Sequence, residues 1–135
     1  MKRALAWSLP LLALLAGCGD SGALGPQVLA GRGQQEAARH QFALSVERGQ
    51  RLIADVGCGS CHTVPGVAGA TGRVAPPLDW FSRRTFIAGE LPNNHANLVR
   101  WLKDPPSVEP GTAMPALGLN DQQASDIATY LETLE

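Results

Sequence analysis

Two cysteines and a histidine lie within five residues near the middle of this 135-residue sequence: Cys58, Cys61 and His62. A Cys-x-x-Cys-His arrangement is the attachment pattern of c-type haem. The two thiols can form thioether bonds to the vinyl groups of the haem, and the imidazole that follows can bind the iron on one face. The spacing therefore predicts one covalently bound haem c with His62 as an iron ligand.

Two cysteines at this spacing could also form a thioredoxin-like redox pair or half of a zinc site. A thioredoxin-like pair follows a strand and precedes a long helix, whereas Pro65 and a glycine-rich run follow this one. A zinc site needs a second pair of ligands at short spacing, which the sequence lacks. Because Cys18 lies in a different setting, no cysteine pair remains for a disulfide. These observations favour haem.

Haem iron has a second axial position, and the sequence offers three candidates for it. Met114 is one of two methionines, and the other, Met1, is the start residue. Met114 is expected to lie in a loop next to a proline, which favours a rigid loop that projects the thioether. His40 and His95 are the alternatives, one in a polar N-terminal segment and one near an expected helix start. A Met/His pair raises the reduction potential relative to two histidines, and we predict Met114 as the ligand.

Helices are expected to position these residues. Apolar residues recur at helical spacing over 45–56, 94–103 and 121–134. Ser45 is a plausible N-cap of the first helix, and Asn120 with Gln123 is a plausible capping box of the last. Residues 107–118, which carry Met114, are punctuated by proline and glycine and are expected to be a loop. Since no run alternates like a strand, the sequence predicts an all-α fold.

The first residues resemble an export signal and not part of the fold. Lys2 and Arg3 precede an apolar run, 4–16, that is too short for a membrane span. The run ends in Leu-Ala-Gly-Cys, which resembles the lipobox of bacterial lipoproteins, where the chain is cut before the cysteine and the thiol is lipidated. An ordinary signal peptide cut nearby is the alternative. We expect residues 1–17 to be a lipoprotein signal peptide and Cys18 to carry the lipid anchor.

The mature chain is expected to contain a tether and one domain. Glycine, alanine and glutamine dominate residues 18–44, which predicts a lipid-anchored flexible tether with at most weak helix over 34–44. Residues 45–135 are predicted to form the haem domain. The formal charge is −1, and it becomes −3 without the two basic residues of the signal peptide. Such a charge gives no indication of nucleic-acid binding.

These features together resemble a class I bacterial cytochrome c, a small fold with helices wrapped around one covalent haem. The resemblance extends over about 45–134 and rests on Gly49, the motif Cys58–His62, Pro76-Pro77-Leu78, Trp101, Met114-Pro115 and Tyr130-Leu131. A closer resemblance is to the cytochrome c domain fused to subunit II of some haem-copper oxidases. It rests on Arg84-Thr85, Ile87-Ala88-Gly89, Leu91-Pro92-Asn93, Asn97-Leu98, Trp101, Pro110-Gly111 and Met114-Pro115-Ala116-Leu117-Gly118-Leu119.

The resemblance implies further cofactor-binding roles. The Pro76 carbonyl would accept a hydrogen bond from Nδ1–H of His62 and fix the imidazole, although a simple turn proline is the alternative. Trp101 would donate its indole N–H to a haem propionate, in addition to ordinary core packing. Arg84 would neutralise a propionate, unless it is a solvated surface arginine.

The sequence departs from the family pattern in two residue types. Ala75 stands where the family has glycine before the proline turn, and Lys103 is the only lysine beyond the signal peptide. A lysine ring around the haem edge, as in soluble mitochondrial cytochromes c, is therefore not expected. No copper-centre domain is expected before the haem domain.

The function implied by the resemblance is electron transfer without a chemical substrate, so we expect a redox carrier and not an enzyme. The expected partners are a terminal oxidase and a quinol-oxidising complex, with a monomer exported to a bacterial membrane and facing the periplasm or the extracellular side. A haem sensor or peroxidase-like enzyme is one alternative, and it requires a labile sixth ligand in place of Met114. An electron-transfer subunit of a dehydrogenase is the other.

Overall fold

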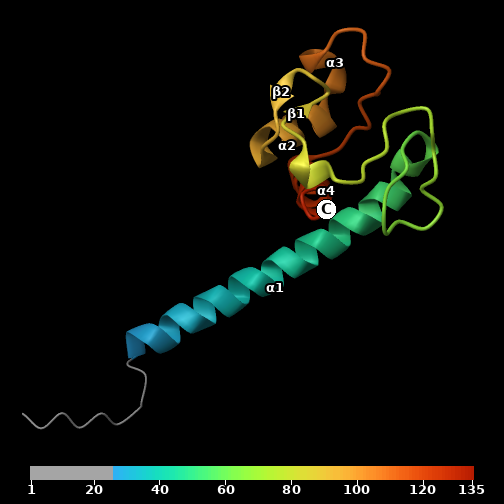
Figure 1. The fold of residues 1–135 in the computed structure, drawn as a ribbon. Coiled ribbons are helices and arrows are strands. Elements are labelled where there is room, and N and C mark those ends of the chain that lie inside the picture. Colours follow the sequence, from blue (N-terminus) through green and yellow to red (C-terminus); the bar gives the residue numbers. More distant parts are fainter. Residues whose placement is uncertain (1–25) are drawn as a thin grey trace, which may run out of the picture.

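The computed structural model describes residues 26–135, so the predicted signal peptide and Cys18 lie outside the described residues. The elements are α1 (Pro26–Asp55), two 3-10 turns, η1 (Cys58–Ser60) and η2 (Phe81–Arg83), strands β1 (Phe86–Ile87) and β2 (Leu91–Pro92), α2 (His95–Lys103), α3 (Pro105–Val108) and α4 (Asp121–Leu131). The fold is mainly helical, as predicted, and Figure 1 shows the other helices gathered near the C-terminal part of α1.

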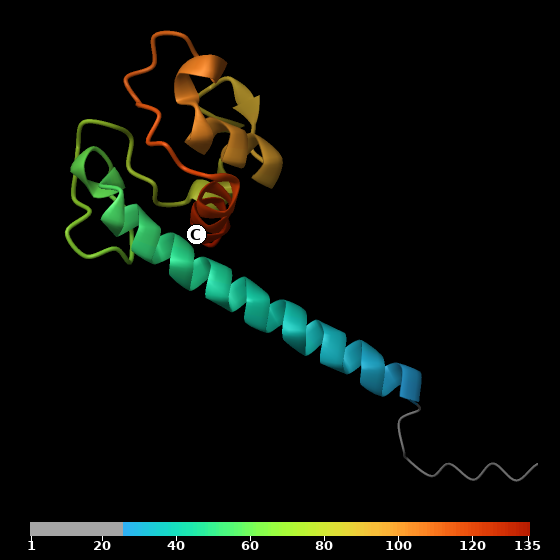
Figure 2. The ribbon, with the colours of Figure 1, turned by 180° about the vertical axis from the view of Figure 1, so that it is seen from behind.

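Helix α1 departs most from the prediction. It is one continuous helix of 30 residues that begins at Pro26, whereas we expected a flexible tether up to residue 44. The tether prediction is therefore wrong for residues 26–44, which we call the stalk. The stalk is exposed over 31–44 and projects away from the domain in Figures 1 and 2. Its glutamine, glutamate, alanine and arginine residues are good helix formers, and they extend a helix that packing has already nucleated.

Helices α1 and α4 cross in close contact at Gly49, which is buried. A Cβ atom at this position would lie 2.0 Å from the backbone oxygen of Asp126 and 2.9 Å from Cβ of Tyr130. Only glycine therefore permits this approach. Helix α4 begins with the predicted capping box of Asn120 and Gln123, and it ends at Leu131 instead of residue 134.

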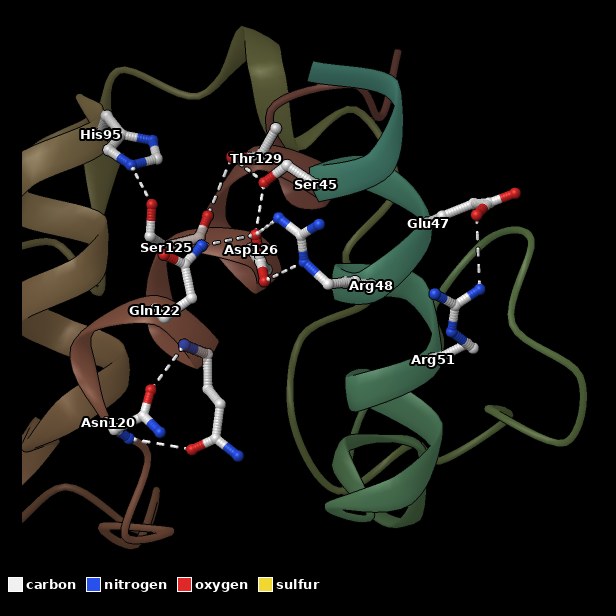
Figure 3. A network of polar contacts seen from close by, with 11 residues as sticks. Ser45, Glu47, Arg48, Arg51, His95, Asn120, Gln122, Ser125, Asp126 and Thr129 are labelled. Carbon is white, nitrogen blue, oxygen red and sulfur yellow. Dashed lines mark hydrogen bonds and ion pairs between the residues drawn. The ribbon is translucent and has the colours of Figure 1, made fainter. Parts of the chain in front are cut away.

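A buried carboxylate joins the two helices just beside this crossing (Figure 3). Asp126 is 2% exposed and accepts two hydrogen bonds from Arg48, at 2.7 and 2.9 Å. Ser45, predicted as an N-cap, lies inside α1 instead, and its hydroxyl donates to the same carboxylate at 2.5 Å. The hydrogen bond from Arg48 holds the pKa of Asp126 below its ordinary value, against the opposing effect of burial. This network fixes the position at which the stalk leaves the domain.

We expect Asp126→Asn to lower the free energy of unfolding by about 2 kcal/mol at pH 7, because the partly buried guanidinium of Arg48 loses its counter-charge. Since the pKa of Asp126 is lowered in the folded state, its contribution is complete above the unfolded pKa of about 4 and is lost as the pH falls through the folded pKa. Urea unfolding at pH 7 and pH 3 measures this.

Glu47→Gln is the matched control for this prediction. Glu47 pairs with Arg51 in the same helix, but both side chains are about two thirds exposed, at 64% and 63%. Such a surface pair contributes about 0.5 kcal/mol or less. A destabilisation by Asp126→Asn that is equally large at pH 3 and pH 7 would contradict the ionic role.

The remaining elements form the wall around the site. Helix α2 is capped by the side chain of Asn94 and packs on α4 through its buried face. Helix α2 ends at Lys103, as predicted, and Pro105 is the first residue of the short helix α3. The hairpin of β1 and β2 was not predicted, because two-residue strands are too short to alternate. No helix among residues 26–135 has the length and apolar character needed to cross a membrane.

Candidate haem-binding site

An apolar cavity lies between the helices and contains most of the predicted site residues. Its lining consists of Ile53, Cys58, His62, Leu78, Phe81, Trp101, Leu102, Met114, Ile127 and Leu131. One predicted thioether cysteine and both predicted iron ligands are therefore brought together from separate parts of the sequence. Cys61, the second cysteine, lies at the C-cap of the η1 turn that also carries Cys58.

The turn that carries the cysteines follows directly from the end of α1. Gly57 has a φ of 81°, in the left-handed region, which lets the chain leave the helix and enter η1. The N–H groups of Cys61 and His62 both donate to the carbonyl of Cys58, at 3.3 and 3.0 Å. This compact turn places both cysteines and the histidine close together in space.

The alternatives for the cysteine pair fit this geometry less well. A helix precedes the pair and an irregular segment follows it, which is the reverse of a thioredoxin-like setting. Burial raises the pKa of the Cys58 thiol, whereas thioredoxin-like cysteines have a lowered pKa. Within residues 26–135 no three His, Cys, Asp or Glu side chains form a cluster that could hold a metal ion. The cysteines are therefore better suited to haem attachment.

A second segment, residues 72–78, runs beside the haem motif and holds its backbone. Gly72 donates to the carbonyl of Gly59 at 3.0 Å, Ala75 to that of Cys61 at 3.0 Å, and Leu78 to that of Thr63 at 2.8 Å. A Cβ atom on Gly72 would lie 2.5 Å from the carbonyl oxygen of Ser60, so glycine is required here for steric reasons. We call residues 72–78 the strap.

The strap also orients the histidine. Nδ1 of His62 lies 2.7 Å from the carbonyl oxygen of Pro76, so Nδ1–H donates to it. This hydrogen bond fixes the tautomer, because the other ring nitrogen, Nε2, is then left with a free lone pair for iron. The contact between His62 and Pro76 that the resemblance implied is present in the structure. An oriented imidazole and a thioether in one apolar cavity are a donor set that fits haem.

Met114 lies in the expected loop and is half-buried. Its N–H donates to the Thr112 hydroxyl at 3.2 Å. The neighbouring glycines, Gly111 and Gly118, have φ values of 104° and 69°, which bend the loop on each side. The loop thereby turns the Met114 thioether into the cavity lining.

The two alternative histidines do not line the cavity. His40 lies in the exposed stalk. His95 is bound elsewhere, with its ring nitrogens 3.0 Å from the Ser125 hydroxyl and 3.1 Å from the Glu132 carboxylate (Figure 3 shows the first contact). This places His95 at the outer contact between α2 and α4. Met114 is consequently the best placed of the three candidates.

The remaining predicted residues lie beside the cavity in different ways. Trp101 is buried on α2 and belongs to the lining. Arg84 donates to the backbone carbonyls of Pro77 and Asp79, and its guanidinium lies 5.2 Å from the centroid of the Phe81 ring. The propionate roles of Trp101 and Arg84 stay predictions. Phe81 also lines the cavity, but its place there could not be predicted from the sequence, because a single aromatic residue in a loop carries no periodic signal.

A covalent-haem motif, an oriented histidine and a loop methionine inside a small helical fold define a class I type of cytochrome. The sequence model of the cytochrome c family matches residues 46–135. The chain therefore belongs to the cytochrome c family, whose cofactor is haem c, and the predicted family and fold are confirmed.

Three curated relatives are named cytochrome c oxidase subunit 2. The relative from Bacillus subtilis is 37% identical over 93 residues, which are 66% of this chain and 26% of the relative. The one from Alkalihalophilus pseudofirmus is 34% identical over 89 residues, 65% and 25% respectively. The one from Bacillus sp. PS3 is 38% identical over 105 residues, 75% and 30%. The chain thus spans less than a third of these relatives' length. No solved structure gives a significant match.

Proposed function

We propose that this chain is a membrane-tethered c-type cytochrome that passes single electrons along a respiratory chain towards a terminal oxidase. The observation that carries the proposal is the meeting of His62, Cys58 and Met114 in one apolar cavity. A haem bound there supplies one-electron chemistry. The protein needs no substrate site for this function, and we propose that it is not an enzyme.

The protein residues hold the redox centre in a fixed environment. The Pro76 carbonyl keeps the His62 ring in one orientation, and its hydrogen bond raises the basicity of the imidazole as a ligand. The Met114 thioether would be the second protein ligand of the iron, and it would exclude exogenous ligands and raise the reduction potential. Buried apolar side chains keep water out of the cavity. Fixed ligands argue against a haem sensor or a peroxidase, both of which require an open position.

The proposed partners follow from the family resemblance and from the relatives. Relatives named as oxidase subunits carry a segment similar to this chain, which supports a terminal oxidase as the electron acceptor. A quinol-oxidising complex is the proposed donor. We further propose that the chain is a monomer, exported and facing the periplasm or the extracellular side.

We propose that Cys18 carries the lipid anchor and that the stalk separates it from the haem domain. The 19 residues 26–44 of helix α1 would span about 28 Å at 1.5 Å per residue. A helical stalk restricts the domain more than a flexible tether of the same length would. The haem would therefore be held at a preferred height above the membrane surface.

Stopped-flow oxidation of the reduced, haem-loaded full chain by host membranes tests the proposed function. Oxidation that is rapid and that stops with an inhibitor of the terminal oxidase is the expected result. Oxidation that is insensitive to the inhibitor would reject the oxidase as acceptor. Reduction of the oxidised chain that depends on an added dehydrogenase substrate would favour the dehydrogenase-subunit alternative.

Cys18→Ala is expected to move the haem protein from the membrane to the soluble fraction, because the variant offers no thiol for lipidation. Cell fractionation followed by haem staining measures the distribution. Cys18→Ala should leave the visible spectrum unchanged, which controls for folding. Retention of the Cys18→Ala protein in the membrane fraction after a high-salt wash would point to another anchor.

A further inference from the structure

Trp80 has an unusual backbone conformation for an aromatic residue. Its φ is 56°, in the left-handed region that favours glycine, and its side chain is 51% exposed. Strained backbone of this kind is found preferentially at functional positions. Packing explains little of it, since half of the side chain is exposed. The conformation and exposure of Trp80 therefore indicate a functional role for its side chain on the protein surface.

The place of Trp80 in the chain links it to the haem cavity. Phe81, the next residue, and Leu78, two residues before, both line the cavity. Trp80 is thus an exposed residue in a segment that also forms part of the cavity wall. A redox partner that docks at Trp80 would come close to the redox centre.

Arg83 adds a positive charge to the same surface. Its guanidinium lies 4.7 Å from the centroid of the Trp80 ring, and its side chain is exposed. Residues 73–84 contain three arginines and one aspartate, a local charge of +2, whereas the rest of the sequence has eight basic and eleven acidic residues. This segment is accordingly a basic region on an otherwise acidic protein.

We propose that Trp80 and Arg83 form a docking surface for a redox-partner protein with a carboxylate-rich face. This inference rests on the proposed function. Tryptophan and arginine are the residues most enriched among those that dominate interface energies, and arginine pairs well with carboxylates. An anionic lipid surface would also attract this pair. A partner protein is favoured because the pair lies in the segment that contributes Leu78 and Phe81 to the wall of the proposed haem cavity, and a lipid surface accepts no electron.

Two variants test the surface, each with a matched control. Trp80→Gly removes the aromatic ring and suits the left-handed backbone, so folding is expected to be preserved. Its control is Phe42→Ala, which removes another exposed aromatic ring, 55% exposed, from the stalk. Arg83→Glu reverses one charge of the pair, and Arg100→Glu reverses an exposed charge on α2.

The readout is the second-order rate constant for oxidation of the reduced, haem-loaded full chain by host membranes. Each test variant should be slower by about tenfold than the wild type, whereas each control should stay within about twofold. The defect of Arg83→Glu should shrink at high salt, because charge attraction is screened. The visible spectrum and the reduction potential should not change in any of the four variants.

The outcomes separate this inference from the proposed function. If the wild type is not oxidised by the membranes, the proposed function fails. If the wild type is oxidised and the test variants match their controls, the docking surface is wrong. Binding of each full-chain variant to vesicles of anionic phospholipid is compared in parallel with binding to neutral vesicles, because the proposed lipid anchor would insert into both. Loss of the preference for anionic vesicles with an unchanged oxidation rate would overturn a protein partner and indicate a lipid surface.

Discussion

A chain that carries both Cys58→Ser and Cys61→Ser is expected to retain no haem after denaturation. Serine hydroxyls do not add to haem vinyl groups under the conditions in which thiols do, so neither thioether can form. Haem staining of a denaturing gel and the intact mass both measure the loss. Each single variant should keep at most one thioether, with reduced haem content.

The double variant should also be poorly folded, because the cavity lining would lose the group that it encloses. Ile53, Phe81 and Ile127 are buried beside the cavity, and without haem they would face a void or water. Far-ultraviolet circular dichroism and thermal unfolding measure this effect. Cys18→Ser is the matched control, since it removes a thiol outside the motif. Haem that remains covalently bound to the double variant would contradict the assignment of both cysteines.

The parts of the site that could be predicted from the sequence are those encoded locally. Five consecutive residues contain both cysteines and one iron ligand, so no knowledge of the fold was needed for them. The assignment of Met114 depended on elimination among few candidates. The structure supports it in a way that the sequence could not, by placing Met114 in the same cavity as His62 and placing His95 at a different helix contact.

The stalk shows where pattern reasoning is weak. A helix is recognised in a sequence by an apolar face that packs on a neighbour. Residues 31–44 pack on nothing and are all exposed, so their sequence contains no such face. Gly31 and Gly33 further suggested a flexible chain. The helix extends there because Ser45 to Asp55 is already held against α4, so that each added residue needs only propagation and no new nucleus.

Contacts between distant segments were the other features that sequence patterns did not indicate. The ion pair of Arg48 with Asp126 joins residues 78 positions apart. The pattern of polar residues in each helix does not indicate which helix it contacts, and the buried face of α4 includes two polar residues, Asp126 and Thr129. The strap is similar, because its hydrogen bonds to the haem motif come from backbone groups that every residue possesses.

Met114→Ala is expected to open the iron to carbon monoxide and cyanide and to lower the reduction potential. The thioether is the proposed second axial ligand, and its removal leaves a position that water or an added ligand can occupy. Axial ligands set haem potentials over a range of about 0.8 V, so the shift should be easy to measure by redox titration. Carbon monoxide difference spectra of the reduced protein give the second readout.

His95→Ala is the control that makes this result decisive. His95 is the other described candidate close to the helical domain, and its ring is held by Ser125 and Glu132 outside the cavity. Its replacement should leave the potential and the carbon monoxide spectrum unchanged. The opposite pattern, in which His95→Ala opens the iron and Met114→Ala does not, would reject Met114 as the ligand. Because a closed iron favours electron transfer and an open one permits sensing or peroxidase chemistry, this pair of variants also decides between those functions.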